Sequence, residues 1–538
     1  MFSIEVLIAL LVAVVILVRL SRFLELPSAI LLLVGGLGLS FVPGFSNIEL
    51  APEMIFTLFL PPLLFVAGVR TSWRDFRQNA RKINLLAIGL VVMTTLVIGF
   101  VAHWTIPELP LAAAFTLGAI VSPTDAIAAT SITNRLGVPR RIVTILEGES
   151  LVNDATGIVV YKLTVAAVLT GAFSIFEAGW QFLLNAGGGI ALGLALGWLF
   201  IFFIDRIEDA PVEITITLIA PFTIYIAADN FLGVSGVLAV VAAGYYFSRR
   251  LPRSNSSETR LQAISFWNML DFLFNGALFL LVGLQLRRIV AGLSGISVWN
   301  AAGYAAIVSA ALILTRILWI FSLTYLPQFL SSKLSKDEML PSWKSVFVVA
   351  WTGMRGAISL AAALALPLTL ASGAQFPERD LIIFITFFVI LATLVVQGLS
   401  LPPIIRRLHL KDDGATAREE AAAQLEILQA ALKRLKEIET AGKVPLQLVN
   451  QLKDDYERRA DGLTAIVSEG ENSCRDFFKN DRDLQLDILK IERETLQNLR
   501  ERGTLHNDAA RHIENDLDLE EQRLQNHVRS ADKNKKSN

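Results

Sequence analysis

Residues 1–410 form a long stretch that is too poor in charge to fold as a water-soluble domain. Only 48 of its side chains are charged, and Leu, Ala, Val, Ile and Phe dominate it. Residues 411–538, by contrast, hold 22 Lys or Arg and 27 Asp or Glu. An apolar helix needs about 20 residues to cross about 30 Å of hydrocarbon, and the first stretch contains many such runs. We therefore expect a membrane domain over 1–410 and a charged helical tail over 411–538. The composition excludes a secreted disulfide scaffold, a nucleic-acid-binding protein with a basic face and a cytosolic enzyme.

The predicted fold is all-α, a polytopic membrane protein with about 13 transmembrane helices. Six helices, one linker helix and six more helices would form two inverted six-helix repeats, because the two halves then begin on opposite sides of the membrane. The predicted spans are 3–20, 27–43, 52–69, 83–104, 110–132, 142–171, 180–204, 211–228, 232–248, 262–286, 299–326, 345–370 and 380–405.

The distribution of Lys and Arg predicts the orientation, because positively charged loops resist translocation. The loops that follow odd-numbered spans hold eighteen Lys or Arg, whereas those that follow even-numbered spans hold only Arg287, Arg288 and Arg379. We expect the N-terminus to lie outside the cell and the tail to lie in the cytoplasm, with the protein in the plasma membrane.

A polar interruption is predicted in span 110–132, at Ser122-Pro123-Thr124-Asp125. Proline removes an amide donor and clashes with the preceding turn, so the helix should break here. Broken backbone at membrane depth survives only where it is buried in protein or lines a watery cavity. The freed carbonyls, Thr124 and Asp125 would offer oxygen ligands to a hard cation. The alternative is a proline kink that Asp125 caps locally.

Span 142–171 carries four polar side chains within six residues: Glu149, Ser150, Asn153 and Asp154. On a helix, Ser150 and Asp154 share one face, and Glu149 and Asn153 share the neighbouring face. A charge inside the bilayer costs at least about 2.5 kcal/mol, so this pattern favours a functional site over simple packing.

Span 345–370 contains an arginine between glycines, Gly353-Met354-Arg355-Gly356. It occupies the same place in the second half as span 110–132 does in the first. Interrupted helices at corresponding repeat positions are typical of transporter binding sites. Arg355 needs an anion, which Glu149 or Asp125 could supply, and a purely structural ion pair is the alternative. Arg316, in span 299–326, is interpreted as a structural arginine that pairs with a carbonyl or a carboxylate.

These segments resemble the signature segments of the monovalent cation:proton antiporters, in the sodium/proton exchanger branch that includes bacterial NhaP-like and eukaryotic NHE proteins. The matches extend over about 400 residues in the expected order. Besides the three segments above, they are Leu60-Pro61-Pro62-Leu63-Leu64-Phe65, Phe266-Trp267, Leu278-Phe279-Leu280-Leu281-Val282-Gly283-Leu284 and Val396-Gln397-Gly398-Leu399.

The resemblance implies a homodimer whose protomers each have a dimerisation part and a mobile six-helix core, with the interrupted spans crossing near span 142–171. By position, Asp154 would bind the ion or the proton with Asn153 as its partner, and Ser150 and Thr124 would complete the cation shell. Glu149 and Arg355 would form a buried ion pair, and Asp125 would stabilise the crossing. Many relatives carry an acid where this chain has Val66, which leaves the choice between Na⁺ and K⁺ open.

The expected function is electroneutral exchange of Na⁺, with Li⁺ or K⁺ as further candidates, for H⁺ in pH and cation homeostasis. A single buried acid holds either a proton or a cation, so each cycle would move one of each. The alternatives are a K⁺/H⁺ or mixed-cation antiporter, a cation channel and, least favoured, a membrane enzyme. We expect no cofactor. We also expect no nucleic acid partner and no ATP coupling, since a phosphate-binding loop of the Gly-x-x-x-x-Gly-Lys type is absent from the sequence.

The tail should form amphipathic helices over 415–440 and about 480–503, because apolar residues recur there at helical spacing among many charges. We interpret it as a helical bundle and not as a catalytic domain. Its single cysteine, Cys474, is expected to be a bystander thiol or, less favoured, a redox handle.

Overall fold

The computed structural model is almost entirely helical. It describes residues 4–24, 26–42, 44–45, 54–71, 73–171, 175–254, 257–293, 296–330, 342–370, 373–410, 415–441, 445–469, 475–501, 513 and 517–521. Within these ranges the only strand-like pairing is a bridge between Thr369 and Gln375. The chain divides into two compact units, one of Met1–Arg135 with Arg141–Leu410 and one of Leu136–Arg140 with Lys411–Asn538. The predicted all-helical class is confirmed.

The first unit is the membrane domain. Eight of its described helices are long and apolar enough to cross a bilayer, and shorter apolar helices cover 28–39, 55–70 and 111–121. The shorter helices coincide with the predicted spans 27–43, 52–69 and 110–132. The helix over 55–70 changes from π-helical to α-helical, and the helix over 111–121 is followed by a break. The number of crossings, thirteen by sequence, stays a prediction.

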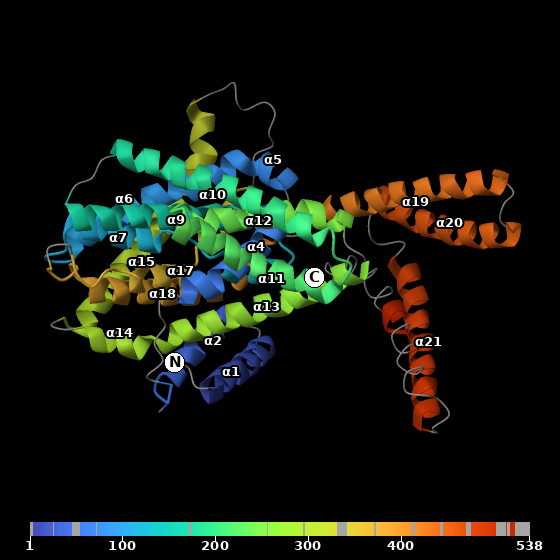
Figure 1. Ribbon diagram of the computed structural model, residues 1–538, viewed down its shortest axis with the longest axis horizontal. Coiled ribbons are helices and arrows are strands. Elements are labelled where there is room, and N and C mark those ends of the chain that lie inside the picture. Colours follow the sequence, from blue (N-terminus) through green and yellow to red (C-terminus); the bar gives the residue numbers. More distant parts are fainter. Residues whose placement is uncertain are drawn as a thin grey trace. The chain divides into compact units, whose positions relative to one another are not determined.

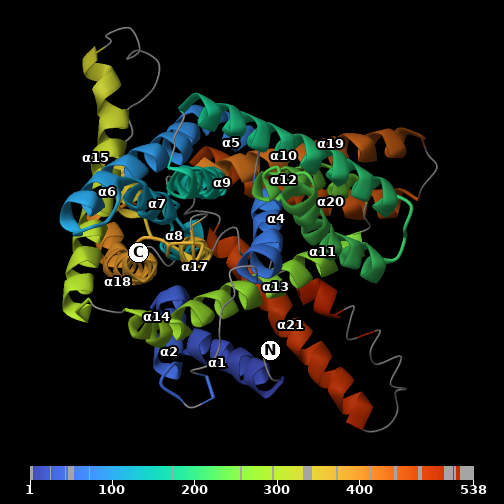
Figure 2. The ribbon, with the colours of Figure 1, turned by 60° about the vertical axis from the view of Figure 1, so that its left-hand side comes forward.

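One group of helices, the core bundle, packs around the interrupted segments. In it α6 contacts α7 and α15, while α18 contacts α7, α8, α15, α16 and α17. Figure 2 shows α6, α7, α15 and α18 lying together to the left of α9. Their bounds are α5 Trp73–Asn84, η2 Leu85–Gly89, α6 Leu90–Thr105, α7 Leu111–Val121, α8 Ala126–Arg135, α9 Arg140–Thr170, α15 Val298–Leu330, α16 Trp343–Trp351, α17 Ala357–Leu364 and α18 Arg379–Leu408.

A second group, the panel, packs mainly with itself. Helix α12 contacts α4, α10 and α11, and α2 contacts α1 and α13 (Figure 1). The bounds are α1 Ile4–Phe23, α2 Ser28–Leu39, η1 Ile55–Phe59, α4 Leu60–Arg70, α10 Ile175–Ile204, α11 Ala210–Ile226, η3 Ala227–Phe231, α12 Gly236–Ser254 and α13 Ser257–Leu284, with the short α14 Leu286–Gly292 following. The three η elements are π-helical turns, which the sequence did not predict.

Close helix contacts in the panel depend on glycine. A Cβ atom on Gly36 of α2 would lie 2.1 Å from the carbonyl oxygen of Leu280, and one on Gly283 of α13 would lie 2.1 Å from that of Leu33. The two backbones therefore touch, as small residues allow in membrane helices.

In the described part of the second unit, the long helices are α19 Ala415–Ala441, α20 Leu446–Glu469 and α21 Arg475–Glu501. Helices α19 and α20 pack along each other as a hairpin (Figure 1). An ion pair of 3.7 Å between Lys453 and Glu439 joins them. The two predicted tail helices correspond to α19 and α21, while α20 was not predicted. Cys474 lies outside the described residues.

Candidate functional site

The two predicted interruptions meet at a backbone crossing. Helix α7 ends at Val121 and α8 begins at Ala126, while α16 ends at Trp351 and α17 begins at Ala357. The amide of Asp125 donates to the carbonyl oxygen of Met354 over 2.8 Å. This hydrogen bond between the two breaks satisfies two polar backbone groups that the helices leave free inside the membrane domain.

Arg355, which lies in the break between α16 and α17, stabilises the same crossing. Its Nε donates to the carbonyl oxygen of Val121 over 2.8 Å, and its Nη1 donates to the carbonyl oxygen of Gly353. Its backbone amide donates to Thr393 Oγ1 of α18 over 3.2 Å. The side chain is fully buried, and its Nη2 has no hydrogen-bond partner among the described residues. Arg355 therefore holds backbone carbonyls together at the crossing.

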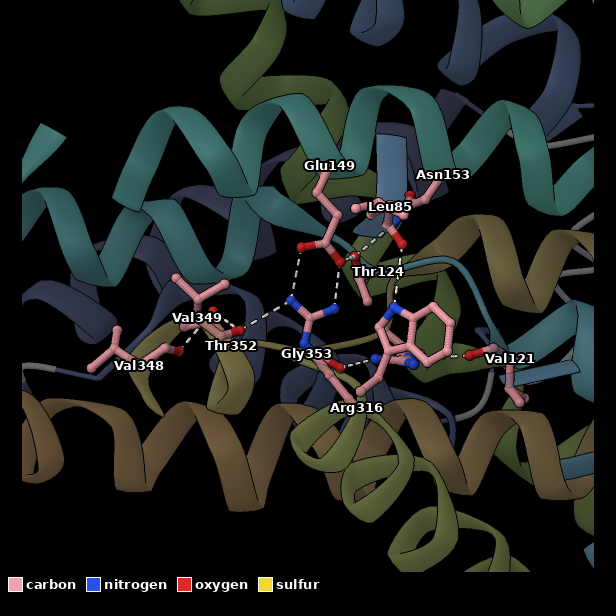
Figure 3. A network of polar contacts seen from close by, with 12 residues as sticks. Leu85, Val121, Thr124, Glu149, Asn153, Arg316, Val348, Val349, Thr352 and Gly353 are labelled. Atoms are coloured by element: carbon pink, nitrogen blue, oxygen red, sulfur yellow. Dashed lines mark hydrogen bonds and ion pairs between the residues drawn. The ribbon is translucent and has the colours of Figure 1, made fainter. Parts of the chain in front are cut away.

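Glu149 pairs with Arg316 of α15, so the predicted Glu149–Arg355 ion pair is wrong. The guanidinium Nη1 contacts Oε1, and Nη2 donates to Oε2 over 2.9 Å, with both side chains 1% exposed. Arg316 Nη2 also donates to the carbonyl oxygen of Val349 over 3.1 Å. Figure 3 shows the two-pronged pair between α9 and α15. The predicted pairing of Arg316 with a carbonyl or a carboxylate is confirmed, since it binds one of each.

The space next to this ion pair is so small that position 353 has room only for glycine. A Cβ atom there would lie 2.4 Å from Cδ of Arg316 and 3.0 Å from Nη1 of Arg355. The glycine of the predicted motif thus lets two arginine side chains approach the same break, where any larger residue would displace one of them.

Thr124 links the Glu149 pair to the polar face of α9. Its hydroxyl donates to Glu149 Oε1 over 3.1 Å and accepts from Asn153 Nδ2 over 2.5 Å. All three side chains are buried (Figure 3). The amide oxygen of Asn153 is also buried and has no hydrogen-bond partner in the described part of the chain. It is an oxygen ligand that the protein leaves available.

Asp154 is buried beside this network, with 8% of its surface exposed. No ion pair or hydrogen bond joins its side chain to another residue within the described ranges. Ser150 lies one turn before it on α9, and the carboxylate of Asp125 is near enough to act on it electrostatically. A buried carboxylate without a partner costs several kcal/mol unless a proton or a cation neutralises it.

The oxygen ligands around Asp154 are suited to a hard monovalent cation. They are a carboxylate, an amide oxygen and hydroxyl groups, all oxygen ligands. The sequence-predicted residues Thr124, Glu149, Ser150, Asn153 and Asp154 thus gather at the place where α9 meets the first break. The structure adds Arg316 to them. In the sequence, Arg316 stands out as a charged residue inside an otherwise apolar span, but nothing there indicates its partner. Val66, in α4 of the panel, is buried.

Comparisons with known proteins find similar sequences over nearly the whole chain. The model of the transmembrane sodium/hydrogen exchanger family matches residues 6–407. An uncharacterized Na⁺/H⁺ exchanger of Mycobacterium tuberculosis is 36% identical over 534 residues, covering 97% of this chain and 96% of the relative. The sodium, potassium, lithium and rubidium/H⁺ antiporter of Bacillus pumilus is 34% identical, covering 94% of this chain and 75% of the relative. The Na⁺/H⁺ antiporter ApNhaP of Aphanothece halophytica is 31% identical, covering 91% of each chain.

A similar fold is found in the solved structure of the sodium proton antiporter MjNhaP1 from Methanocaldococcus jannaschii. The TM-score is 0.60 at 20% identity, covering 75% of this chain and 98% of that structure.

Proposed function

Because the chain belongs to the sodium/hydrogen exchanger family, we propose that it is a secondary active antiporter that exchanges a monovalent cation for a proton at Asp154. The observation that carries the proposal is the buried carboxylate of Asp154, which no described residue neutralises, next to the available amide oxygen of Asn153. Either a proton or an alkali cation supplies the missing positive charge, and the two compete for one place.

The charges around the site support a one-for-one exchange. Glu149 is neutralised by Arg316, so it contributes no exchangeable proton while that pair stands. Asp125 and Arg355 belong to the crossing and carry opposite charges. Asp154 is then the one acid that changes its occupant, and the loaded site has the same net charge with either ion. Exchange would be electroneutral and driven by the two concentration gradients.

Alternating access would move the core bundle against the panel and expose Asp154 to one side at a time. The excess of Lys and Arg after odd-numbered spans supports an outer N-terminus and a cytoplasmic tail in the plasma membrane. The panel would supply the contact in a homodimer, by resemblance to the family.

Na⁺ is the cation that most relatives' names give, and we propose it as the main substrate. A second candidate is a broader K⁺, Li⁺ and Na⁺ exchanger, because two Bacillus relatives at 34% identity are named for several alkali cations. The apolar Val66 in place of an acid removes a possible cation ligand from α4.

Asp154→Asn in inside-out vesicles tests the proposal. Acidified vesicles that contain a pH-sensitive dye should release protons when Na⁺, Li⁺ or K⁺ is added, and the variant should release none. Glu147→Gln, an exposed acid on the same helix, is the matched control and should retain exchange. Exchange by folded Asp154→Asn protein would exclude the proposed site, and cation flux without proton release would indicate a channel.

A further inference from the structure

An ion pair connects the core bundle to the panel in the part of α9 that follows Asp154. Lys162 of α9 donates from Nζ to Asp229 Oδ1 of η3 over 2.9 Å. The side chains are 57% and 31% exposed. The two residues belong to the two groups of helices that would have to move relative to each other during exchange.

Lys162 lies on the face of α9 that packs on the panel. Ala155 belongs to an apolar cluster formed with α4, α10, α11 and α12, and Ile158 packs against that cluster. Lys162 follows Ala155 by seven residues, which brings it to within about 20° of the same helix face. It is eight residues beyond Asp154, a rise of about 12 Å along the helix. The ion pair therefore lies in the same interface between α9 and the panel as the apolar contacts. We call this interface the seam. Along α9, the ion pair is between Asp154 and the end of the helix at Thr170.

Asp229 is positioned by a local irregularity of the panel. The α-helix α11 widens into the π-helical turn Ala227–Phe231 at its end. The chain then turns back, with the amide of Val234 bonded to the carbonyl oxygen of Ala228 over 2.9 Å. Single π-turns are rare and are often found at functional positions. Here the turn presents an acid to the core bundle.

We propose that Lys162 and Asp229 form a latch that keeps the Asp154 site closed on the side of the membrane where α9 ends. The inference rests on the proposed function, because only an alternating-access carrier needs this seam to open. Both side chains are partly exposed, so the pair is weak enough to break in every cycle. The orientation proposed above makes this the outer side.

A matched control exists within the panel. Arg70 of α4 contacts Asp271 of α13 over 2.9 Å, with side chains 53% and 23% exposed. Its exposure resembles that of the latch, but it joins two helices of the same group. Breaking it should leave the seam between the groups unchanged.

The test measures access to the seam with a thiol reagent. Cys474→Ser removes the only cysteine, and Ile158→Cys places a reporter between Asp154 and Lys162. A membrane-impermeant maleimide is added to whole cells, and the labelling rate is measured. Lys162→Met or Asp229→Asn should each raise the rate about two- to fivefold, the shift in population expected when one exposed ion pair is lost. The exchanged pair Lys162→Glu with Asp229→Lys should restore the parent rate.

Four results would overturn the latch. The single variants could label at the parent rate, Arg70→Met could accelerate labelling equally, or the exchanged pair could label as fast as the single variants. A rise seen also from the opposite face, in inside-out vesicles, would show general loosening and would equally exclude it. Labelling requires no ion exchange, so failure of the proposed function, judged by Asp154→Asn, is detected separately.

Discussion

The side-chain amide of Asn153 donates to the hydroxyl of Thr124 over 2.5 Å, which connects α9 directly to the first helix break. The Thr124 hydroxyl in turn donates a hydrogen bond to the carboxylate of Glu149. The break and the polar face of α9 are therefore joined by hydrogen bonds. The bond from Nδ2 of Asn153 also fixes the direction of Oδ1, the oxygen of the same amide group, which accepts no hydrogen bond from the described residues.

Asn153→Ala should weaken cation binding without unfolding the protein. The variant loses the hydrogen bond to Thr124 and the amide oxygen beside Asp154. Loss of a hydrogen bond of about 1 kcal/mol predicts an apparent KM for Na⁺ raised about fivefold, and more if the oxygen binds the cation directly. Proton release from vesicles over a range of Na⁺ concentrations measures this. Thr156→Val is the control, because the Thr156 hydroxyl bonds only within α9, to the carbonyl oxygen of Val152. An unchanged KM in Asn153→Ala would remove this residue from the site.

Glu149 and Arg316 should be strongly coupled in stability. Glu149→Gln or Arg316→Met alone leaves one buried charge without its partner, which costs about 3–5 kcal/mol. The double variant should recover much of this loss, because both charges are then gone. Thermal unfolding of detergent-solubilised protein gives the four free energies of the cycle.

The same cycle with Arg355→Met serves as its control. Arg355 bonds to the carbonyl oxygens of Val121 and Gly353 and not to Glu149. Its coupling to Glu149 should therefore be the smaller of the two. Stronger coupling of Glu149 to Arg355 than to Arg316 would contradict the observed pairing.

The sequence predicted the helix breaks because their causes are local. Pro123 removes an amide donor and crowds the preceding turn, and Gly353 and Gly356 weaken a helix through backbone entropy. The neighbouring faces that Asn153 and Asp154 occupy likewise follow from helical periodicity alone. The π-turn that holds Asp229 has no such local signal.

The partner of Glu149 could not be predicted because it depends on how distant helices pack. Arg316 is 167 residues away in the sequence, and Arg355 is also an intramembrane arginine. Nothing in their own segments ranks one above the other. The resemblance favoured Arg355 because it stands in a recognisable motif, whereas the packing of α15 against α9 brings Arg316 to the carboxylate.

Gly36→Ala should destabilise the panel, while Gly38→Ala in the same helix should not. A methyl group at Gly36 meets the backbone carbonyl of Leu280 at 2.1 Å, which cannot move without separating α2 from α13. Overpacking of this kind costs about 1–3 kcal/mol. At Gly38 nothing lies within 4 Å, and alanine favours the helix by up to about 1 kcal/mol. Melting temperatures in detergent compare the two. Equal melting temperatures would show that the helices are not in backbone contact.

Gly356→Ala should abolish exchange by forcing the crossing apart. A Cβ atom at Gly356 would lie 2.5 Å from Oδ2 and 2.8 Å from Cβ of Asp125, so rotation of the carboxylate alone cannot relieve the clash. The break must then shift, and the hydrogen bond from the Asp125 amide to Met354 shifts with it. Gly398→Ala is the control near the same methionine. Its nearest neighbour, Cδ1 of Ile30 at 2.9 Å, is the flexible end of a side chain, so exchange should persist. Dye-based proton release from vesicles with matched protein levels measures both variants. Normal exchange by Gly356→Ala would mean that the geometry of the crossing is not needed for transport.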